Sequence, residues 1–238
     1  MKNANDPMGA AIHDYFKNAK SERLRVFSPD FEEDEIPVAT LFRNKAQMSV
    51  IERKALEYCH GKILDVGAGS GCHSIVLKQA GKEVSAIDIS PLSVQVMQER
   101  GLRAFEYDLF DPAFDERYDT ILMLMNGAGI IGRIERLGAF FERMKQLLLP
   151  GGSILMDSSD LKYLYEEEDG SFLIDLNGKY YGEIEYQMQY KDIVGSPFDW
   201  LYIDFDTLAY YAAQNGFKTE LLVEGEYYDY LARLTVLP

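Results

Sequence analysis

The residues with the clearest chemical meaning form a glycine-rich turn, Gly-Ala-Gly-Ser-Gly, at positions 67–71. A turn of this kind lets the backbone approach a ligand closely and adopts φ values that other residues avoid. The helix expected after the turn directs its unpaired N–H groups toward whatever binds there. Asp88 ends the next apolar segment, seventeen residues after Gly71. A carboxylate in that position can accept hydrogen bonds from two ribose hydroxyls, so the pattern indicates a nucleoside site.

The spacing of the glycines distinguishes between classes of nucleoside ligand. A dinucleotide fingerprint, G-x-G-x-x-G/A, would place its last position on Cys72 or on Ser74, and neither residue fits it. The phosphate-loop pattern G-x-x-x-x-G-K-[ST] does not occur in the chain. Instead, an acidic residue, Asp65, precedes the first glycine by two positions. An NAD-binding oxidoreductase remains an alternative on these residues alone.

The turn must be positioned by alternating strands and helices. Short apolar runs typical of strands buried on both faces alternate with helical segments. The expected strands are 62–66, a segment ending at Asp88, 103–106, 118–125, 153–156, 217–224 and 230–237, with helices at 92–100 and 133–149 among those between them. Such alternation predicts an α/β fold, a doubly wound and mostly parallel sheet whose ligands bind beyond the carboxyl ends of the strands.

Three features of this order resemble the class I S-adenosylmethionine (SAM) dependent methyltransferases. Asp65-x-Gly67-x-Gly69-x-Gly71 resembles their motif I, Asp108-Leu109 follows the third strand, and Leu149-Pro150-Gly151-Gly152 resembles their junction before the fifth strand. The resemblance implies seven strands in the order 3-2-1-4-5-7-6, the last one antiparallel. It also implies that SAM is the methyl donor and S-adenosylhomocysteine the product.

The resemblance assigns roles to individual residues. The acidic residue before the turn helps hold the methionine end, Asp88 the ribose, and Asp108 with Leu109 the adenine. The cofactor-binding residues expected in this way are Asp65, Gly67, Ala68, Gly69, Asp88, Ile89, Asp108, Leu109, Asn126 and Gly127. On the substrate side we expect Arg43, Met48, Ser158 and Ser159. Arg43 fits an exposed arginine equally well, Met48 a core methionine, and the segment 157–160 a helix cap.

Methyl transfer from a sulfonium requires mainly the alignment of donor and acceptor, and a general base only where the acceptor must lose a proton early. The candidates for such a base are His73, Asp157, Asp160 and the tyrosine residues of the segment 161–200. His73 lies in the first turn of a helix, where the dipole disfavours its charged form, so we expect a neutral, partly buried imidazole. Two cysteines and three histidines form no metal-ligand pattern, and we expect no metal.

The chain divides into an N-terminal helical extension, 1–41, and a methyltransferase domain, 42–238, that carries an inserted flap at 161–200. The extension is expected to hold a helix at 12–20. The flap is expected to be a β-hairpin of strands 171–176 and 180–191, joined by the turn Asn177-Gly178. It is rich in aromatic residues, which pack planar acceptors or attract cationic ones. These residues are Tyr163, Tyr165, Tyr180, Tyr181, Tyr186, Tyr190, Phe198 and Trp200.

Composition limits the partners. A net charge of −15 disfavours nucleic acid, and no basic stripe is visible. The chain has neither a signal-like N-terminus nor an apolar run long enough for a membrane span, which predicts a cytoplasmic protein. We therefore expect a methyltransferase acting on a small molecule. A SAM-binding regulator without transferase activity shares every cofactor residue, and a methylase of basic protein tails also stays open.

Overall fold

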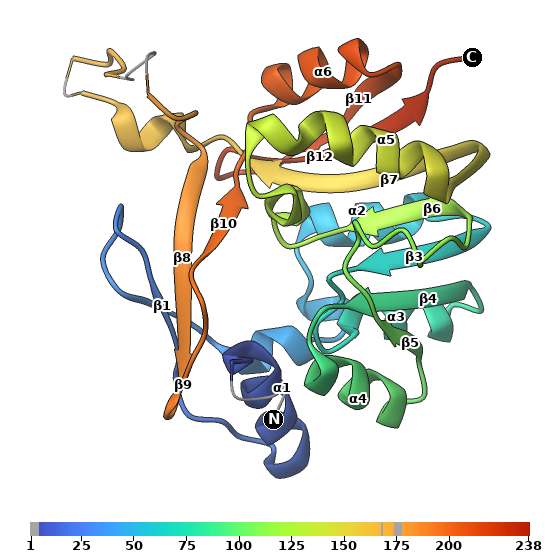
Figure 1. The fold of residues 1–238 in the computed structure, drawn as a ribbon, viewed down its shortest axis with the longest axis vertical. Coiled ribbons are helices and arrows are strands. Elements are labelled where there is room, and N and C mark those ends of the chain that lie inside the picture. The colour runs from blue at the N-terminus through green and yellow to red at the C-terminus, as the bar shows by residue number, and fades with distance from the viewer. Residues whose placement is uncertain (1–4, 168, 174–177) are drawn as a thin grey trace.

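The computed structural model describes residues 5–167, 169–173 and 178–238. Its larger sheet has seven strands, in the spatial order β11-β12-β7-β6-β3-β4-β5 (Figure 1). The strands are β3 (Lys62–Val66), β4 (Glu83–Asp88), β5 (Arg103–Glu106), β6 (Tyr118–Met123), β7 (Leu148–Ser159), β11 (Phe217–Glu224) and β12 (Asp229–Val236). Numbered along the chain within this sheet, they lie in the order 3-2-1-4-5-7-6, and β12 runs antiparallel between β7 and β11. The predicted strand order is confirmed.

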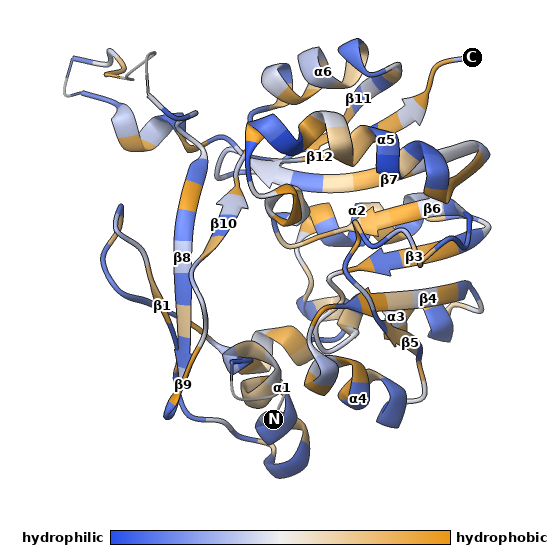
Figure 2. Ribbon diagram, in the orientation of Figure 1, coloured by the Kyte–Doolittle hydropathy of each residue, from blue (hydrophilic) through white to orange (hydrophobic). Residues whose placement is uncertain are grey.

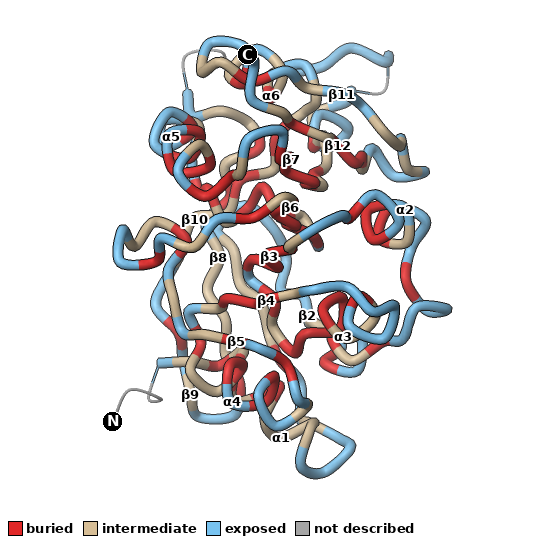
Figure 3. Tube along the Cα trace, turned by 90° about the vertical axis from the view of Figure 1, so that its right-hand side faces the viewer, coloured by how far each residue is buried: buried red, intermediate tan, exposed pale blue. Residues whose placement is uncertain are grey.

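Helices cover both faces of this sheet because successive strand residues point to opposite sides. On one face, α5 (Leu137–Leu147) and α6 (Phe205–Gln214) pack on side chains such as Leu64 and Ile121. On the other, α2 (Val50–Tyr58) and α3 (Cys72–Gln79) pack on their neighbours Ile63 and Leu122. The helix α4 (Pro91–Glu99) packs with β4 and β5. The apolar strands of the larger sheet lie between the two layers of helices (Figure 2). Buried residues are concentrated along these strands (Figure 3). The doubly wound α/β class is confirmed.

A second, antiparallel sheet stands across the ends toward which the parallel strands point (Figure 1). Its order is β10-β8-β1-β2, with a short strand paired to β8. These strands are β1 (Leu24–Phe27), β2 (Asp34–Ile36), β8 (Glu183–Tyr190), β9 (Ile193–Val194) and β10 (Phe198–Leu201). Leu24 pairs with Tyr190, so the N-terminal segment and the insertion form one sheet.

The N-terminal helix and five short 3-10 helices complete the described chain. The helix α1 (Pro7–Asn18) packs on α4. The 3-10 helices are η1 (Val38–Phe42), η2 (Lys45–Gln47), η3 (Gly127–Ile131), η4 (Ile134–Arg136) and η5 (Leu161–Tyr165). A Cβ atom at Gly129 in η3 would overlap the Trp200 indole of β10, so the second sheet packs directly on the segment that follows β6.

Two expectations about the added segments need correction. The N-terminal extension contains the expected helix, at 7–18 instead of 12–20, and it also provides two strands that were not predicted. The insertion is β-structured, but β8 pairs with β1, β9 and β10 and not with the described residues 171–173. Residues 174–177, which include Asn177 of the expected hairpin turn, lie outside the described residues. Cross-strand partners so distant in sequence leave no local signal.

Candidate active site

The turn after β3 has the conformation that its glycines suggested. Gly67 and Gly71 have φ angles of +66° and +79°, in the left-handed region that side chains disfavour. A Cβ atom on Gly67 would lie 2.7 Å from the Ile130 Cδ1 atom, and one on Gly71 would overlap Leu102. The Gly71 N–H donates to the Ala68 carbonyl at 2.8 Å, which closes the turn. Glycine is therefore required for both conformation and space.

Asp88 joins this turn to the end of β4. One carboxylate oxygen accepts from the Gly69 N–H at 2.8 Å and the other from the Ser90 N–H, also at 2.8 Å. Burial raises the pKa of Asp88 to about 6, against the effect of these two bonds, and the carboxylates of Asp6 and Asp65 add to the rise. Each oxygen keeps further lone pairs for a ligand. The adjacent Ile89 is 73% exposed, which leaves a large apolar side chain open beside the carboxylate.

Asp65 lies on the inner side of the same turn. Its side chain is buried and accepts a 2.7 Å hydrogen bond from the Ser74 hydroxyl in α3. Burial raises the pKa of this carboxyl, while the field of His73 and the bond from Ser74 lower it. Asp65 thus contacts the first turn of α3 and fixes that helix against β3.

A buried ionic group, Arg43–Glu52–His73, connects three elements beside the turn. The Arg43 guanidinium pairs with the Glu52 carboxylate, its Nε donating at 3.0 Å. The His73 Nε2 atom lies 2.7 Å from the same carboxylate. Glu52 also accepts from the Ser49 N–H at 2.8 Å and so begins α2. All three side chains are buried, which makes this group a rigid link between the segment after η1, α2 and α3.

The charges in this group stabilise one another. Burial opposes the ionisation of Glu52, but the bonds from His73 and Arg43 lower its pKa to about 2. Burial would also lower the pKa of His73, but the Cys72 and Glu52 side chains and the field of Asp65 raise it to about 10. These contacts favour the protonated imidazole, in contrast to the neutral ring that the helix dipole had suggested. The helix dipole lowers the pKa of His73 by less than the adjacent carboxylates raise it.

Arg43 and Met48, which we expected on the substrate side, both lie inside the protein. Arg43 is buried, and its charge is paired with Glu52 inside the protein. Met48 is 2% exposed and packs with Ile51 and Ala55 of α2, so it occupies the core. Neither side chain lines a described cavity on the substrate side.

The turn after β6 is unusual in its backbone. Met125 and Asn126 both have positive φ angles, +69° and +55°. Asp157 holds this turn, its carboxylate accepting from the Met125 N–H at 3.1 Å and from the Gly127 N–H at 2.8 Å. Burial raises the pKa of Asp157 to about 6, against these bonds. Each oxygen accepts from one backbone donor, so Asp157 positions the turn. Strain of this kind concentrates at functional sites.

Of the three candidate residues at the end of β7, Ser158, Ser159 and Asp160, Ser159 lines a described cavity. The Ser159 hydroxyl donates to the Asn126 side chain at 2.9 Å. Ser158 is buried and accepts from the Ile203 N–H at 2.9 Å. Asp160 caps η5 through the Lys162 N–H and accepts from the Tyr181 hydroxyl at 2.8 Å. The structure therefore favours capping for Asp160 and a packing role for Ser158.

Asp108 and Leu109 follow β5 as expected, just beyond the carboxyl end of this edge strand. Asp108 is exposed and accepts from the Phe110 N–H at 2.8 Å, which closes a tight turn. Leu109 is 3% exposed and belongs to the main core. The Arg143 guanidinium donates to its carbonyl at 2.7 Å and so fixes the segment to α5.

A cavity of about 310 Å³ opens beyond the ends of β6 and β7. Its lining joins residues of six segments: Phe31, Asn126, Ser159, Leu161, Tyr163, Leu164, Tyr186, Tyr202 and Tyr227. The sequence had indicated Tyr163 and Tyr186 in an aromatic flap, and Asn126 and Ser159 at strand ends. It missed Phe31, Tyr202 and Tyr227, because they come from loops far apart in the chain.

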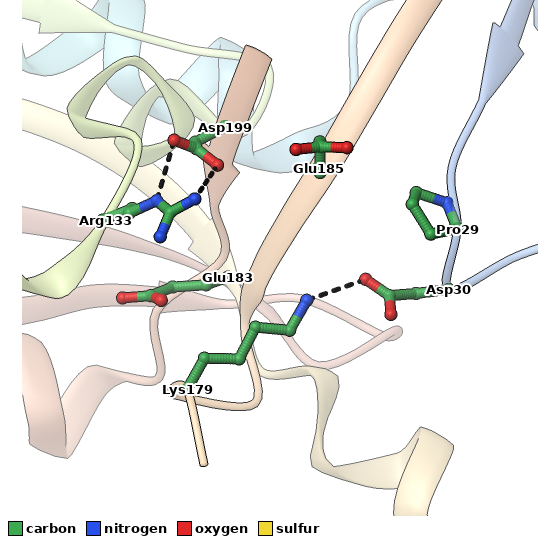
Figure 4. Close-up of a pocket in the computed structure, with 7 residues that line it drawn as sticks. All are labelled: Pro29, Asp30, Arg133, Lys179, Glu183, Glu185 and Asp199. Atoms are coloured by element: carbon green, nitrogen blue, oxygen red, sulfur yellow. Dashed lines mark hydrogen bonds and ion pairs between the residues drawn. The ribbon is translucent and has the colours of Figure 1, made fainter. Parts of the chain in front are cut away.

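A second cavity, of about 180 Å³, lies on the second sheet and is charged (Figure 4). Arg133 forms two 2.8 Å hydrogen bonds with Asp199, and Lys179 pairs with Asp30 at 2.9 Å. Glu183 accepts from the Ile134 N–H at 2.8 Å. These groups mostly satisfy one another, which is the arrangement of a solvated ionic surface. In the described part of the chain, no group of three or more residues could hold a metal ion, and no helix could cross a membrane.

Comparison with known proteins places this geometry in context. A family profile described as a methyltransferase domain matches residues 63–152. The crystal structure of a SAM-dependent methyltransferase from Bacteroides fragilis, in complex with S-adenosyl-L-homocysteine, is 62% identical, with a TM-score of 0.95 over 100% of this chain and 98% of that one.

Two curated relatives match over shorter segments. An uncharacterized methyltransferase from Staphylococcus carnosus (strain TM300) is 31% identical over 56% of this chain and 68% of its own length. The cypemycin N-terminal methyltransferase of a Streptomyces species is 31% identical over 41% of this chain, and the match spans only 42% of that protein.

Proposed function

The chain belongs to the SAM-dependent methyltransferase family, and we propose that it transfers a methyl group from SAM to a small-molecule acceptor. SAM supplies a methyl group already activated by the positive charge on sulfur. The protein's own residues then have to bind the donor, orient the acceptor and exclude water between them. The proposal assigns these tasks to the ends of neighbouring strands in the larger sheet.

The observation that carries this proposal is the bond between Asp88 and the glycine turn. Its carboxylate is held by the Gly69 and Ser90 N–H groups at 2.8 Å each, so its remaining lone pairs have a fixed direction. We propose that they accept the ribose hydroxyls. The exposed Ile89 would contact the adenine, and the side-chain-free backbone of Gly67 and Gly69 would pass beside the methionine end. The residues present fit this ligand.

Acceptor binding is assigned to the turn after β6 and to the 310 Å³ cavity. The strands β3 and β6 are direct neighbours, and adjacent strands lie about 4.8 Å apart. A donor over the turn after β3 and an acceptor in the cavity are therefore within reach of an in-line displacement. Asn126, which lines the cavity, and Gly127 next to it would mark the boundary between the two ligands.

We propose that none of His73, Asp157 and Asp160 acts as the general base. His73 is buried with its Nε2 atom beside the Glu52 carboxylate, and the Asp157 carboxylate holds the turn after β6 through the Met125 and Gly127 N–H groups. Asp160 accepts from Tyr181 and Lys162. The acceptor would lose its proton to solvent, and the rate enhancement would come from alignment. These three candidates become positioning residues in this proposal.

Calorimetric titration with SAM, S-adenosylhomocysteine and NAD tests the donor assignment. We expect SAM and S-adenosylhomocysteine to bind and NAD not to bind. Binding of NAD without binding of SAM would contradict the proposal. Incubation with methyl-labelled SAM and a metabolite library then separates an enzyme from a SAM-binding regulator. Label transferred to an acceptor supports the enzyme, whereas donor binding without any transfer supports the regulator.

The organisation of the chain and its location are also proposed. We assign residues 42–238 to the methyltransferase domain and residues 1–41 together with 161–200 to a cover over its substrate side. The pairing of β1 with β8 supports this assignment, because it joins both segments in one sheet. Two free, buried cysteines, Cys59 and Cys72, support a reducing cytoplasmic setting.

A further inference from the structure

The cavity beyond β6 and β7 has an unusual lining. Four of its nine residues are tyrosines, and a fifth, Phe31, is also aromatic. The others are two leucines, an asparagine and a serine, so the described lining carries no formal charge. Tyrosine rings present electron-rich faces to a ligand and attract cations placed over them. A volume of about 310 Å³ suits a small molecule.

The polar groups of the lining largely bind one another. The Tyr186 and Tyr202 hydroxyls lie 3.2 Å apart in a hydrogen bond, and the Ser159 hydroxyl donates to Asn126 at 2.9 Å. Burial raises the pKa values of Tyr186 and Tyr202, so both phenols stay neutral at physiological pH. An acceptor with a carboxylate or phosphate would find no cationic side chain in the described lining.

The charge around the mouth of the cavity is negative. Phe31 lies within the acidic segment 30–35, where Lys179 pairs with Asp30, Arg25 with Glu33 and Arg23 with Glu35. No cationic partner is present for Glu32 or Asp34 among the described residues. Lys162, beside the cavity, is paired with Asp160 at 3.1 Å. Together with a net charge of −15, this segment attracts cations toward the aromatic lining.

We propose that this cavity, lined by Phe31, Tyr163, Tyr186, Tyr202 and Tyr227, binds the acceptor as an amine and makes the protein an N-methyltransferase. The inference rests on the proposed methyltransferase function and narrows its substrate class. The aromatic rings hold the protonated amine by cation–π attraction, and the acidic segment raises its local concentration. A neutral planar acceptor would use the rings but not the surrounding charge.

The transfer step balances without a further reagent. The bound ammonium group first releases one proton to water through the mouth of the cavity. The nitrogen lone pair then forms the new N–C bond while the C–S bond of the sulfonium breaks. The electron pair of that bond stays on sulfur, which becomes the neutral thioether of S-adenosylhomocysteine. The product is a methylated ammonium ion.

The first experiment compares three ligands of similar shape on the full-length protein saturated with S-adenosylhomocysteine. Choline is cationic, 3,3-dimethylbutan-1-ol is its neutral carbon isostere, and 3,3-dimethylbutanoate is anionic. Calorimetry should show choline binding on the order of tenfold more tightly than the neutral isostere, with the anion weakest. Equal or tighter binding of the neutral or anionic ligand overturns the inference, as does a cavity that binds none of them.

Two exposed tyrosines allow the rings to be tested without disturbing the core. Tyr227 is 79% and Tyr163 is 42% exposed, so Tyr227→Leu and Tyr163→Leu should fold normally. Each should reduce the preference for choline over its neutral isostere by about threefold or more, whereas Tyr227→Phe keeps the ring and the preference. Tyr210→Leu, on an exposed tyrosine of α6, is the matched control. An unchanged preference in both leucine variants contradicts the assignment.

A transfer assay connects binding with chemistry. Methyl-labelled SAM is offered with panels of primary and secondary amines, phenols, thiols and carboxylic acids. Label in the amines supports the inference, and label confined to another panel overturns it while leaving the methyltransferase proposal intact. Failure of S-adenosylhomocysteine to bind at the outset is a separate result, because it contradicts the proposed function itself.

Discussion

The carboxylate of Asp88 accepts a 2.8 Å hydrogen bond from the backbone N–H of Gly69. This bond joins the glycine turn after β3 to the end of β4, the neighbouring strand. Two segments separated by nineteen positions therefore present one surface, in which the backbone conformation and a fixed carboxylate depend on each other. Donor binding should be sensitive to a change on either side of the bond.

Replacing Asp88 should weaken donor binding. In Asp88→Ala the turn loses its acceptor and the proposed ribose contacts disappear, so the Kd for SAM should rise about 10–100-fold. Asp88→Asn keeps one oxygen and should have a smaller effect. Glu83→Gln, at the exposed opposite end of β4, is the control and should leave the Kd unchanged. Calorimetric titration measures all three, and an unaltered Kd in Asp88→Ala would exclude the carboxylate from the site.

Gly71 should tolerate substitution less well than a glycine with the same backbone conformation and open space. Gly71→Ala places a Cβ atom on Leu102 and 3.0 Å from the Met97 Cγ atom, at a φ angle of +79°. We expect a loss of about 2–5 kcal/mol in the free energy of unfolding. Gly81, with a φ angle of +75°, has no atom within 4 Å of its added Cβ. Gly81→Ala should therefore cost only about 1–2 kcal/mol in urea titrations.

The buried Glu52 should be more important for stability than an exposed glutamate in the same helix. Glu52→Gln leaves the Arg43 guanidinium buried without a countercharge, which should lower the free energy of unfolding by about 3–5 kcal/mol. Glu57, exposed and paired with Lys54 at 2.8 Å, gives the control. Glu57→Gln should change stability by less than about 1 kcal/mol. Equal stability of the two variants would contradict the role of the ionic group.

The stability that His73 provides should decrease in alkaline solution. Its pKa is raised in the folded protein from 6.5 to about 10, so the folded state binds the proton more tightly than the unfolded state. The stabilisation is fully present below about pH 6.5 and is lost as the pH rises through about 10.

Unfolding of His73→Gln and of the wild type at pH 7 and pH 10 measures this dependence. The difference in their free energies of unfolding should shrink by at least about 1.4 kcal/mol over this range, the equivalent of one pKa unit. Gln79→Ala, at an exposed position of α3 without a titratable group, should show a difference from the wild type that does not vary with pH. A constant difference for His73→Gln would mean that the imidazole is neutral.

The sequence alone determined the larger sheet and the donor half of the candidate site. Strand positions, helix positions and the glycine turn follow from local apolar periodicity, caps and backbone preferences, which short segments express by themselves. The strand order was implied by the resemblance to the class I methyltransferases. Asp65, the glycines and Asp88 lie within one strand–helix–strand unit, so their proximity was implied by their spacing. The proximity of these residues could therefore be predicted without knowing any contact between distant segments.

The tertiary structure decided everything that depends on contacts between distant segments. The pairing of β1 with β8 and the cavity that joins Phe31, Tyr163 and Tyr227 unite residues whose separation in sequence hides their proximity. Protonation states also depend on contacts between residues that are distant in sequence. The sequence placed His73 at a helix N-terminus and predicted a neutral ring, but Glu52, twenty-one residues away, lies 2.7 Å from it. A nearby carboxylate outweighs a helix dipole, and only the folded chain brings that carboxylate close.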